Sequence, residues 1–340
     1  MSQPRLYWID LTKSIAIFAV VLVHAVYMTA PPFYHFDPQY KLSWLSAMLF
    51  YSIGRIGVPL FFMVSGYLMI KKEESIIHFY SKRIQKLFIP LIVWSLIYAL
   101  FTHYFIQKKI TFSLSTPFFY HLWFLYVILF LYLITPLLIA IRKTTSGKRI
   151  FSILTIIWFI LFLLFPYLIK LLGFTKVISY PYGTYYAGFA GYFILGYLLG
   201  ELRITSKKQL IFTLSVLLLS TTLTLYLTYH ATLHIGTFDS FFSSYYSLSV
   251  FTATIAAFFM LKYRTFKPYL QKQVTMVASL SFGIYLIHPI FLALLKRWFS
   301  FSSIPENAYL ILPVTLATFI LSTITVYLMQ RINILKLIVP

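Results

Sequence analysis

One uninterrupted apolar stretch decides the class of fold: residues 120–141 read YHLWFLYVILFLYLITPLLIAI and contain no Lys, Arg, Asp or Glu. A helix needs about 20 predominantly apolar residues to cross the hydrocarbon core of a bilayer. The apolar residues run continuously instead of alternating with polar ones. The stretch therefore predicts a membrane-spanning helix and excludes a strand of a transmembrane barrel.

Similar stretches recur along the whole chain of 340 residues, of which 60% are hydrophobic and 10% are charged. Soluble domains carry about 25% charged residues, so a soluble enzyme, a coiled coil and a disordered chain are excluded. We predict an all-α polytopic membrane bundle that forms a single domain over residues 1–340, without an attached soluble domain. The expected spans are about 8–30, 44–70, 87–106, 120–141, 150–170, 183–202, 209–229, 244–262, 275–296 and 307–330.

The basic residues predict how these spans are oriented. With the N-terminus inside, 19 of the 28 Lys and Arg residues fall in cytoplasmic segments and 7 in external loops, while Lys13 and Arg55 fall inside the bilayer. Cytoplasmic loops carry such an excess, so both termini are expected in the cytoplasm. The formal charge of +21 is then explained by the orientation of the spans and does not indicate a nucleic-acid partner. The high Lys, Ile and Phe content is typical of an AT-rich bacterial genome, and we expect a multi-pass protein of a bacterial cytoplasmic membrane.

An ionisable side chain inside a bilayer costs free energy, so each one calls for a structural or functional explanation. Lys13 and His24 lie in the first predicted span, where a helix places them on the same side, about 16 Å apart along its axis. Either His24 takes part in chemistry, or it bonds a neighbouring helix while Asp10 and Lys13 form a buried ion pair. Arg55 lies near the middle of the second span and cannot lose its proton. It lines a polar cavity or pairs with backbone carbonyls.

Further candidates lie at the third and ninth spans. Arg83 and Lys86 gather positive charge at the start of the third span, which suits a polyphosphate but also ordinary cytoplasmic anchoring. His288 precedes Pro289, which frees a backbone carbonyl one turn earlier. This residue is either part of a polar opening or a satisfied core histidine. The chain has no Cys, which excludes a cysteine nucleophile and a thiolate metal site, and we expect no bound metal.

Together these residues resemble the acyltransferase-3 family of integral membrane acyltransferases. Lys13-x10-His24 is similar to the Arg-x10-His signature of that family, and residues 55–68, RIGVPLFFMVSGYL, are similar to its second-span motif. Arg83-x-x-Lys86 followed by Pro90 resembles its Arg-x-x-Arg…Pro element, and residues 121–126 and 281–288 also look like family segments. Lys stands at positions 13 and 86 where Arg is usual, which keeps the charge but loses the planar guanidinium.

The resemblance implies an acyl-CoA-dependent O-acyltransferase. It would move an acyl group, above all acetyl, from cytoplasmic acyl-CoA to a hydroxyl of an extracytoplasmic or lipid-linked glycan, with no bound cofactor and no nucleic acid. His24 would act as general base or carry the acyl group, and Arg55 would stabilise negative charge or hold a phosphate. The resemblance further implies that acyl-CoA binds to Lys13, Arg83 and Lys86, and that the substrate path includes His288, Tyr285, His121 and Trp123.

Two other classes of function stay open. Ten spans with intramembrane charges also suit a transporter of a glycan or lipid-linked sugar, although transporters often contain two-fold internal repeats and the sequence shows none. A non-catalytic scaffold in a cell-surface assembly is the other alternative. It predicts that His24 is dispensable.

Overall fold

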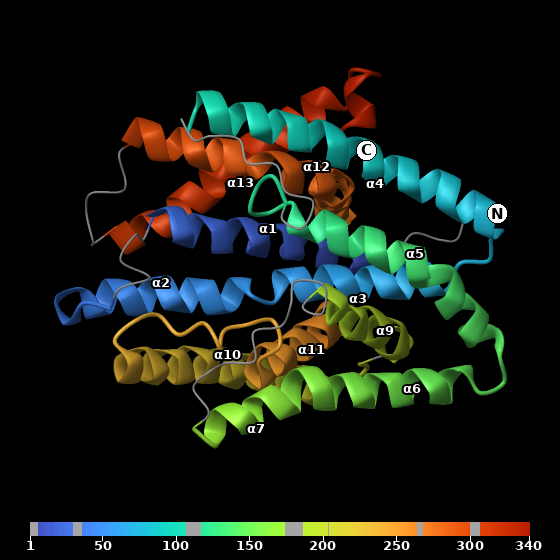
Figure 1. Cartoon of the computed structure of the whole chain (residues 1–340), viewed down its shortest axis with the longest axis horizontal. Helices are drawn as coiled ribbons and strands as arrows, with labels where there is room; N and C mark the ends of the chain where they lie inside the picture. The colour runs from blue at the N-terminus through green and yellow to red at the C-terminus, as the bar shows by residue number, and fades with distance from the viewer. Residues whose placement is uncertain are drawn as a thin grey trace. The chain divides into compact units, whose positions relative to one another are not determined.

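The computed structural model describes residues 6–29, 36–106, 117–173, 186–202, 204–263, 268–299 and 307–340. These residues form helices and no strand, which confirms the all-α class (Figure 1). Among them, eight stretches are long and apolar enough to cross a membrane: Tyr7–Thr29, Pro38–Ile70, Ile76–Tyr104, Trp123–Lys143, Gly147–Leu171, Lys207–Ile235, Leu270–Phe299 and Ala308–Met329. Two shorter apolar helices, Phe189–Gly200 and Leu248–Tyr263, stand where the other two spans were predicted. The chain is a multi-pass membrane protein.

The described residues form the following helices. In chain order they are α1 (Tyr7–Thr29), η2 (Pro38–Tyr40), α2 (Lys41–Gly54), α3 (Gly57–Ile70), α4 (Ile76–Tyr104), α5 (Trp123–Lys143), α6 (Gly147–Trp158), the π-helix η3 (Phe159–Leu164), α7 (Phe165–Leu171), α9 (Phe189–Gly200), α10 (Lys207–Ile235), α11 (Leu248–Tyr263), α12 (Pro268–Phe299), η5 (Asn307–Leu310), α13 (Ile311–Met329) and η6 (Leu335–Leu337). Helix α4 begins well before the start predicted near residue 87, because the Ser75 side chain caps it by accepting a hydrogen bond from the His78 N–H.

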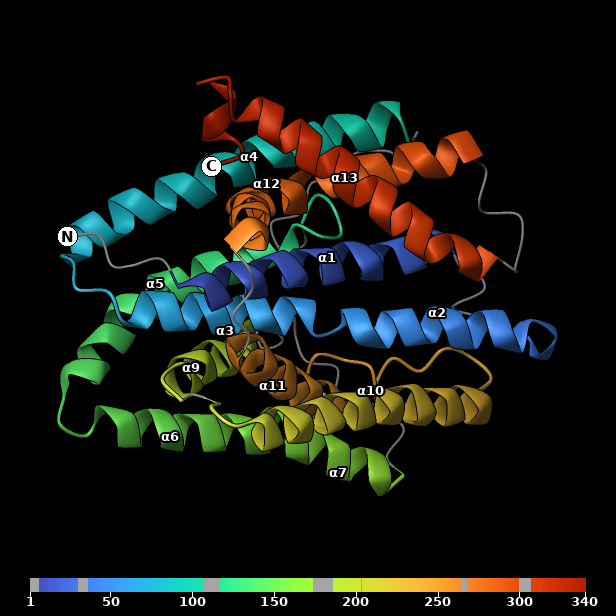
Figure 2. The same cartoon turned by 180° about the vertical axis from the view of Figure 1, so that it is seen from behind.

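The chain divides into two compact units. The first comprises Met1–Phe61, Leu161–Gly173 and Leu202–Val326, and the second comprises Phe62–Ile160, Phe174–Glu201 and Tyr327–Pro340. In the first unit α1 packs along α12, and α10 packs along both α11 and α2, as both views show (Figures 1 and 2). In the second unit α5 contacts α4, α6 and α9, and α6 also packs on α9.

The second predicted span is broken in its middle. Helix α2 ends at Gly54 and α3 begins at Gly57, so that Arg55 stands in the break. A Cβ at Gly54 would lie 2.9 Å from the Ala19 carbonyl oxygen, and one at Gly57 would lie 2.7 Å from the Ala16 carbonyl oxygen. Only glycine permits so close an approach to α1. The two glycines therefore press the break, and Arg55 with it, against the first helix.

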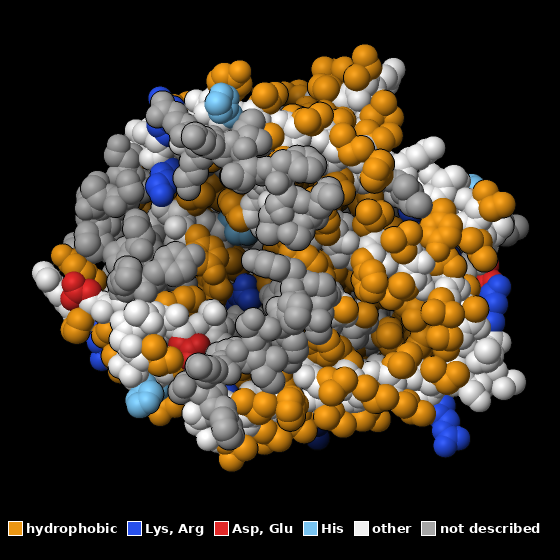
Figure 3. Space-filling model, in the orientation of Figure 1, with side chains coloured by type: hydrophobic (Ala, Val, Ile, Leu, Met, Phe, Trp, Pro, Cys, Tyr) orange, Lys and Arg blue, Asp and Glu red, His pale blue; other side chains and the backbone are white. Residues whose placement is uncertain are grey.

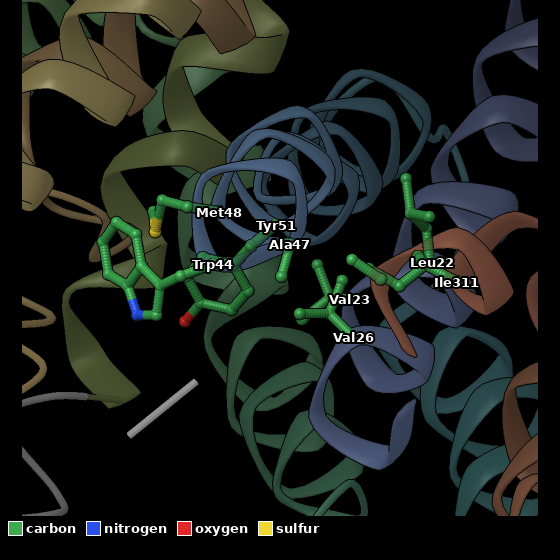
Figure 4. Packing of buried hydrophobic residues seen from close by; sticks show 9 residues of the cluster. Leu22, Val23, Val26, Trp44, Ala47, Met48, Tyr51 and Ile311 are labelled. Carbon is green, nitrogen blue, oxygen red and sulfur yellow. The ribbon is translucent and has the colours of Figure 1, made fainter. Parts of the chain in front are cut away.

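A hydrophobic cluster fixes α1 against α2 in the first unit. It is formed by Leu22, Val23, Val26, Trp44, Ala47, Met48, Tyr51, Ala308 and Ile311, most of which Figure 4 shows side by side. The α1 members lie at positions 22, 23 and 26, which form one face of a helix. This face flanks His24 directly, so the packing of α1 on α2 determines the position of that side chain.

Large apolar side chains also cover much of the outer surface. Hydrophobic side chains predominate among the coloured residues on the face in Figure 3. Leu218 and Leu219 on α10, for example, are 60% and 70% exposed. A surface of this kind is unfavourable in water but suits contact with lipid tails.

Two helices of the second unit cross at unusually close range. A Cβ at Gly196 of α9 would lie 2.0 Å from the Met63 carbonyl oxygen, and one at Gly66 of α3 would lie 1.8 Å from the Phe193 carbonyl oxygen. Small residues let membrane helices approach in this way. The crossing thus depends on glycine from both sides.

We expect Gly196→Ala to destabilise the protein by about 1–3 kcal/mol, because the added methyl group forces α3 and α9 apart. Ala140→Val is a suitable control, since position 140 is exposed on α5. The measurement is the denaturation midpoint of the purified proteins in detergent. Equal midpoints for Gly196→Ala and the control would contradict the close crossing.

Candidate active site

Two histidines from distant parts of the chain meet in the first unit. His24 of α1 and His288 of α12 lie with Nδ1 of the former 2.7 Å from Nε2 of the latter. Their rings are almost parallel, with centroids 4.9 Å apart and planes inclined by 13°. His288 is fully buried, whereas His24 is only partly buried. The pair therefore has one member that is fully buried and one that is only partly buried.

Helix packing brings this pair together. Leu292 and Leu295 follow His288 on the same face of α12 and form a buried cluster with Ala25, the residue after His24. This cluster holds α12 against α1 on one side of His24, while the cluster shared with α2 holds the other side. The pair is thus positioned by apolar packing of three helices.

The inner histidine is also held by its own helix. Nδ1 of His288 lies 2.7 Å from the carbonyl oxygen of Tyr285 and 3.2 Å from that of Ile284. The side chain of Tyr285 is buried as well. The structure bonds the Tyr285 carbonyl to the His288 ring, which in turn contacts His24; the role of His288 and Tyr285 in a substrate path stays a prediction.

Arg55 is buried and contacts a carbonyl and two aromatic rings. Its Nε donates a hydrogen bond to the Ser243 carbonyl oxygen at 2.6 Å. Its guanidinium carbon lies 3.5 Å from the ring centroid of Tyr245 and 5.2 Å from that of Tyr51. These stacking contacts stabilise the cation inside the bundle. They carry no formal charge, so they leave the positive charge of Arg55 in place.

The segment that contacts Arg55 is the connection between α10 and α11. Helix α10 stops at Gly236, whose φ is 79°, and residues 236–247 run back along α10 before α11 begins (Figures 1 and 2). Helix α11 has 16 residues and covers about 24 Å, less than the hydrocarbon core. Irregular backbone at membrane depth is tolerated where protein buries it, and Ser243, Tyr245 and Tyr246 are all buried.

An ion pair anchors the outer part of this connection. Nζ of Lys170, on α7, lies 2.8 Å from Oδ2 of Asp239, and both side chains are largely buried. The other carboxylate oxygen of Asp239 accepts a hydrogen bond from the Phe241 N–H at 2.9 Å. The connection thus forms an ordered wall beside Arg55.

Lys13 lies on the same regular helix as His24, as expected, and its side chain is partly buried. Close by in sequence, Asp10 is buried and accepts a hydrogen bond from the Thr275 hydroxyl at 3.2 Å. The predicted binding of acyl-CoA to Lys13 stays a prediction.

Arg83 and Lys86 lie in the second unit, on α4, in different environments. Arg83 is buried; it pairs with Glu74 and stacks on the Phe79 ring, whereas Lys86 is exposed. The carboxylate of the neighbouring residue Glu73 is paired as well. Hydrogen bonds from Arg142, and then from Lys143, lower the pKa of Glu73. A phosphate that binds Arg83 must therefore compete with a carboxylate.

His121 and Trp123 also belong to the second unit. His121 is buried, and its ring centroid lies 4.8 Å from that of Tyr98. Trp123 begins α5 and stacks on Tyr186, with the two rings 6.1 Å apart. Both residues are members of aromatic clusters, and their role in a substrate path stays a prediction.

A comparison with known families agrees with the pattern of these residues. The family described as acyltransferase domain, the acyltransferase-3 family, matches residues 6–329. The chain belongs to the acyltransferase-3 family. It is accordingly a membrane acyltransferase. Neither the curated proteins nor the solved structures contain a match to the chain.

The sequence did not reveal which groups of this acyltransferase contact Arg55. Ser243 and Tyr245 are 188 and 190 positions further along the chain, in a connection that we predicted to lie partly inside a span beginning near residue 244. The run FFSSYYS at 241–247 is the one available signal, because three serines within an apolar stretch favour local hydrogen bonding over a regular helix.

We expect Lys170→Met to lower the free energy of unfolding by about 3 kcal/mol or more, because it removes the cation from the buried Asp239 carboxylate. The double variant Lys170→Met with Asp239→Asn should recover much of that loss, since the remaining amide carries no charge. Lys272→Met, at an exposed position, is the matched control. Denaturation midpoints in detergent measure all three, and a double variant that loses as much stability as Lys170→Met alone, or more, would contradict the buried pair.

Proposed function

We propose that this acyltransferase moves an acyl group, above all acetyl, from acyl-CoA to a hydroxyl of an extracytoplasmic or lipid-linked glycan, in a bacterial cytoplasmic membrane. The observation that carries the proposal is the hydrogen-bonded pair of His24 and His288, which lies in the same unit as the buried Arg55. An imidazole is the common general base of acyl transfer, and a fixed cation suits the negative charge that develops on the acyl carbonyl.

The proposed proton transfers take place at His24 of the first unit. Nε2 of His24 takes the proton of the acceptor hydroxyl while the hydroxyl oxygen attacks the thioester carbonyl carbon. The carbon–sulfur bond then breaks, and the leaving thiolate takes the proton from His24. The products are an O-acyl ester and CoA with a free thiol, and the histidine returns to its neutral form.

Arg55 would act on the carbonyl oxygen of the acyl group. Its stacking on Tyr245 and its hydrogen bond to Ser243 hold the guanidinium in one orientation before the reaction. A preorganised cation in an apolar surround stabilises an oxyanion more than it would in water. The binding of acyl-CoA phosphates by Lys13, Arg83 and Lys86 is part of the proposal and rests on the family resemblance.

The absence of Cys makes a direct assay simple. Purified protein, acetyl-CoA and the surface glycan of the host are mixed, and the CoA thiol is followed with a thiol-reactive dye that does not react with the protein. We expect His24→Ala to lower the rate of acceptor-dependent thiol release about 10²–10⁴-fold, together with the ester content of the glycan.

His230→Ala is the matched control, because His230 is exposed at the end of α10. It should retain the wild-type rate. Full activity of His24→Ala would exclude the proposed base. A wild-type protein that transports the glycan without forming ester would overturn the proposed function in favour of a transporter.

A further inference from the structure

The proline after His288 releases one particular carbonyl. In an α-helix, each N–H donates to the carbonyl four residues earlier, so residue 289 would normally bond to Tyr285. Pro289 has no N–H, and the Tyr285 carbonyl loses its helical partner. The structure shows what replaces it: Nδ1 of His288 lies 2.7 Å from that oxygen.

This contact fixes where the proton of His288 sits. A carbonyl oxygen only accepts hydrogen bonds, so Nδ1 of His288 carries the hydrogen. In a neutral ring the lone pair is then on Nε2, which faces Nδ1 of His24 at 2.7 Å. Nδ1 of His24 must therefore be the donor. The lone pair of a neutral His24 is left on Nε2, the nitrogen that can accept a proton.

We propose that His288 is a positioning residue, which holds His24 in the tautomer with its basic lone pair on Nε2, and that Pro289 supports it by releasing the Tyr285 carbonyl. This inference rests on the proposed function for its catalytic meaning. The orienting group that bonds His24 Nδ1 is a neutral imidazole, whereas acyl-transfer triads use a carboxylate for the same task. A neutral ring is easier to bury among apolar helices than a carboxylate is.

The tautomer can be measured without any enzymatic assay. The probe is wild-type protein in detergent with ¹⁵N-labelled histidine, whose ring-nitrogen chemical shifts distinguish protonated from unprotonated nitrogens. The signals of His24 and His288 are assigned from those lost in His24→Gln and His288→Gln. We expect hydrogen on Nδ1 of both rings. Hydrogen on Nε2 of His24 in the wild type would overturn the proposal, whatever the activity of the protein.

Kinetics then separate positioning from mere packing. His288→Leu removes the acceptor and should lower kcat about 100-fold with little change in KM for acetyl-CoA. His288→Gln keeps an oxygen that can accept from His24 and should stay within about 10-fold of the wild type. Pro289→Ala gives Tyr285 a competing donor and should lower kcat less than His288→Leu does.

The outcomes distinguish the two levels of proposal. Similar kcat values for His288→Gln and His288→Leu, with both proteins folded by their denaturation midpoints, would overturn the positioning role. If His288→Leu does not fold, a Pro289→Ala protein with unchanged kcat and an unchanged His24 tautomer would overturn the role of the proline. A wild-type protein with the expected tautomers but no acetyl transfer would contradict the proposed function alone.

Discussion

A hydrocarbon interior offers no hydrogen-bond partners, so every polar group between these helices has to find its partner within the protein. That constraint explains how the polar residues of the first unit are arranged. Arg55 donates to a backbone carbonyl and stacks on aromatic rings, Asp239 pairs with Lys170, and the two histidines bond each other. Each pairing joins segments that are far apart in sequence. The polar contacts therefore also determine how the helices and the α10–α11 connection come together.

The same constraint separates the site into a rigid part and a reactive part. His288 uses both ring nitrogens in bonds to the protein and is fully buried. His24 bonds to it and is only partly buried. A reacting group needs this combination, because its orientation has to be fixed while one atom stays within reach of a substrate. The position of Arg55 is fixed as well, because Gly54 and Gly57 place the break between α2 and α3 directly against α1.

Much of this organisation was predictable from the sequence, and the reasons for the failures are physical. Long apolar runs predicted the helical class and the approximate spans, and ionisable residues within those runs pointed to His24 and Arg55. The pairing of His24 with His288 was not predictable, because 264 positions separate them and a span that is apolar on all sides does not indicate which face meets which helix. The break at Arg55 and the inward course of residues 236–247 depend on tertiary packing, which the local sequence does not encode.

The most direct test of the acyl-transfer site is a structure of the protein bound to a ketone analogue of acetyl-CoA, in which a methylene group replaces the thioester sulfur so that the bond to the carbonyl carbon cannot be cleaved. The measured quantity is the distance from Nε2 of His24 to the carbonyl carbon of the analogue, with the acceptor hydroxyl filling the space between them. We predict that the acyl end lies beside His24, at about 4–6 Å from Nε2, with its oxygen directed toward Arg55; reacting atoms in such sites stand about 3–3.5 Å apart. An acyl end bound away from both residues would contradict the proposed site.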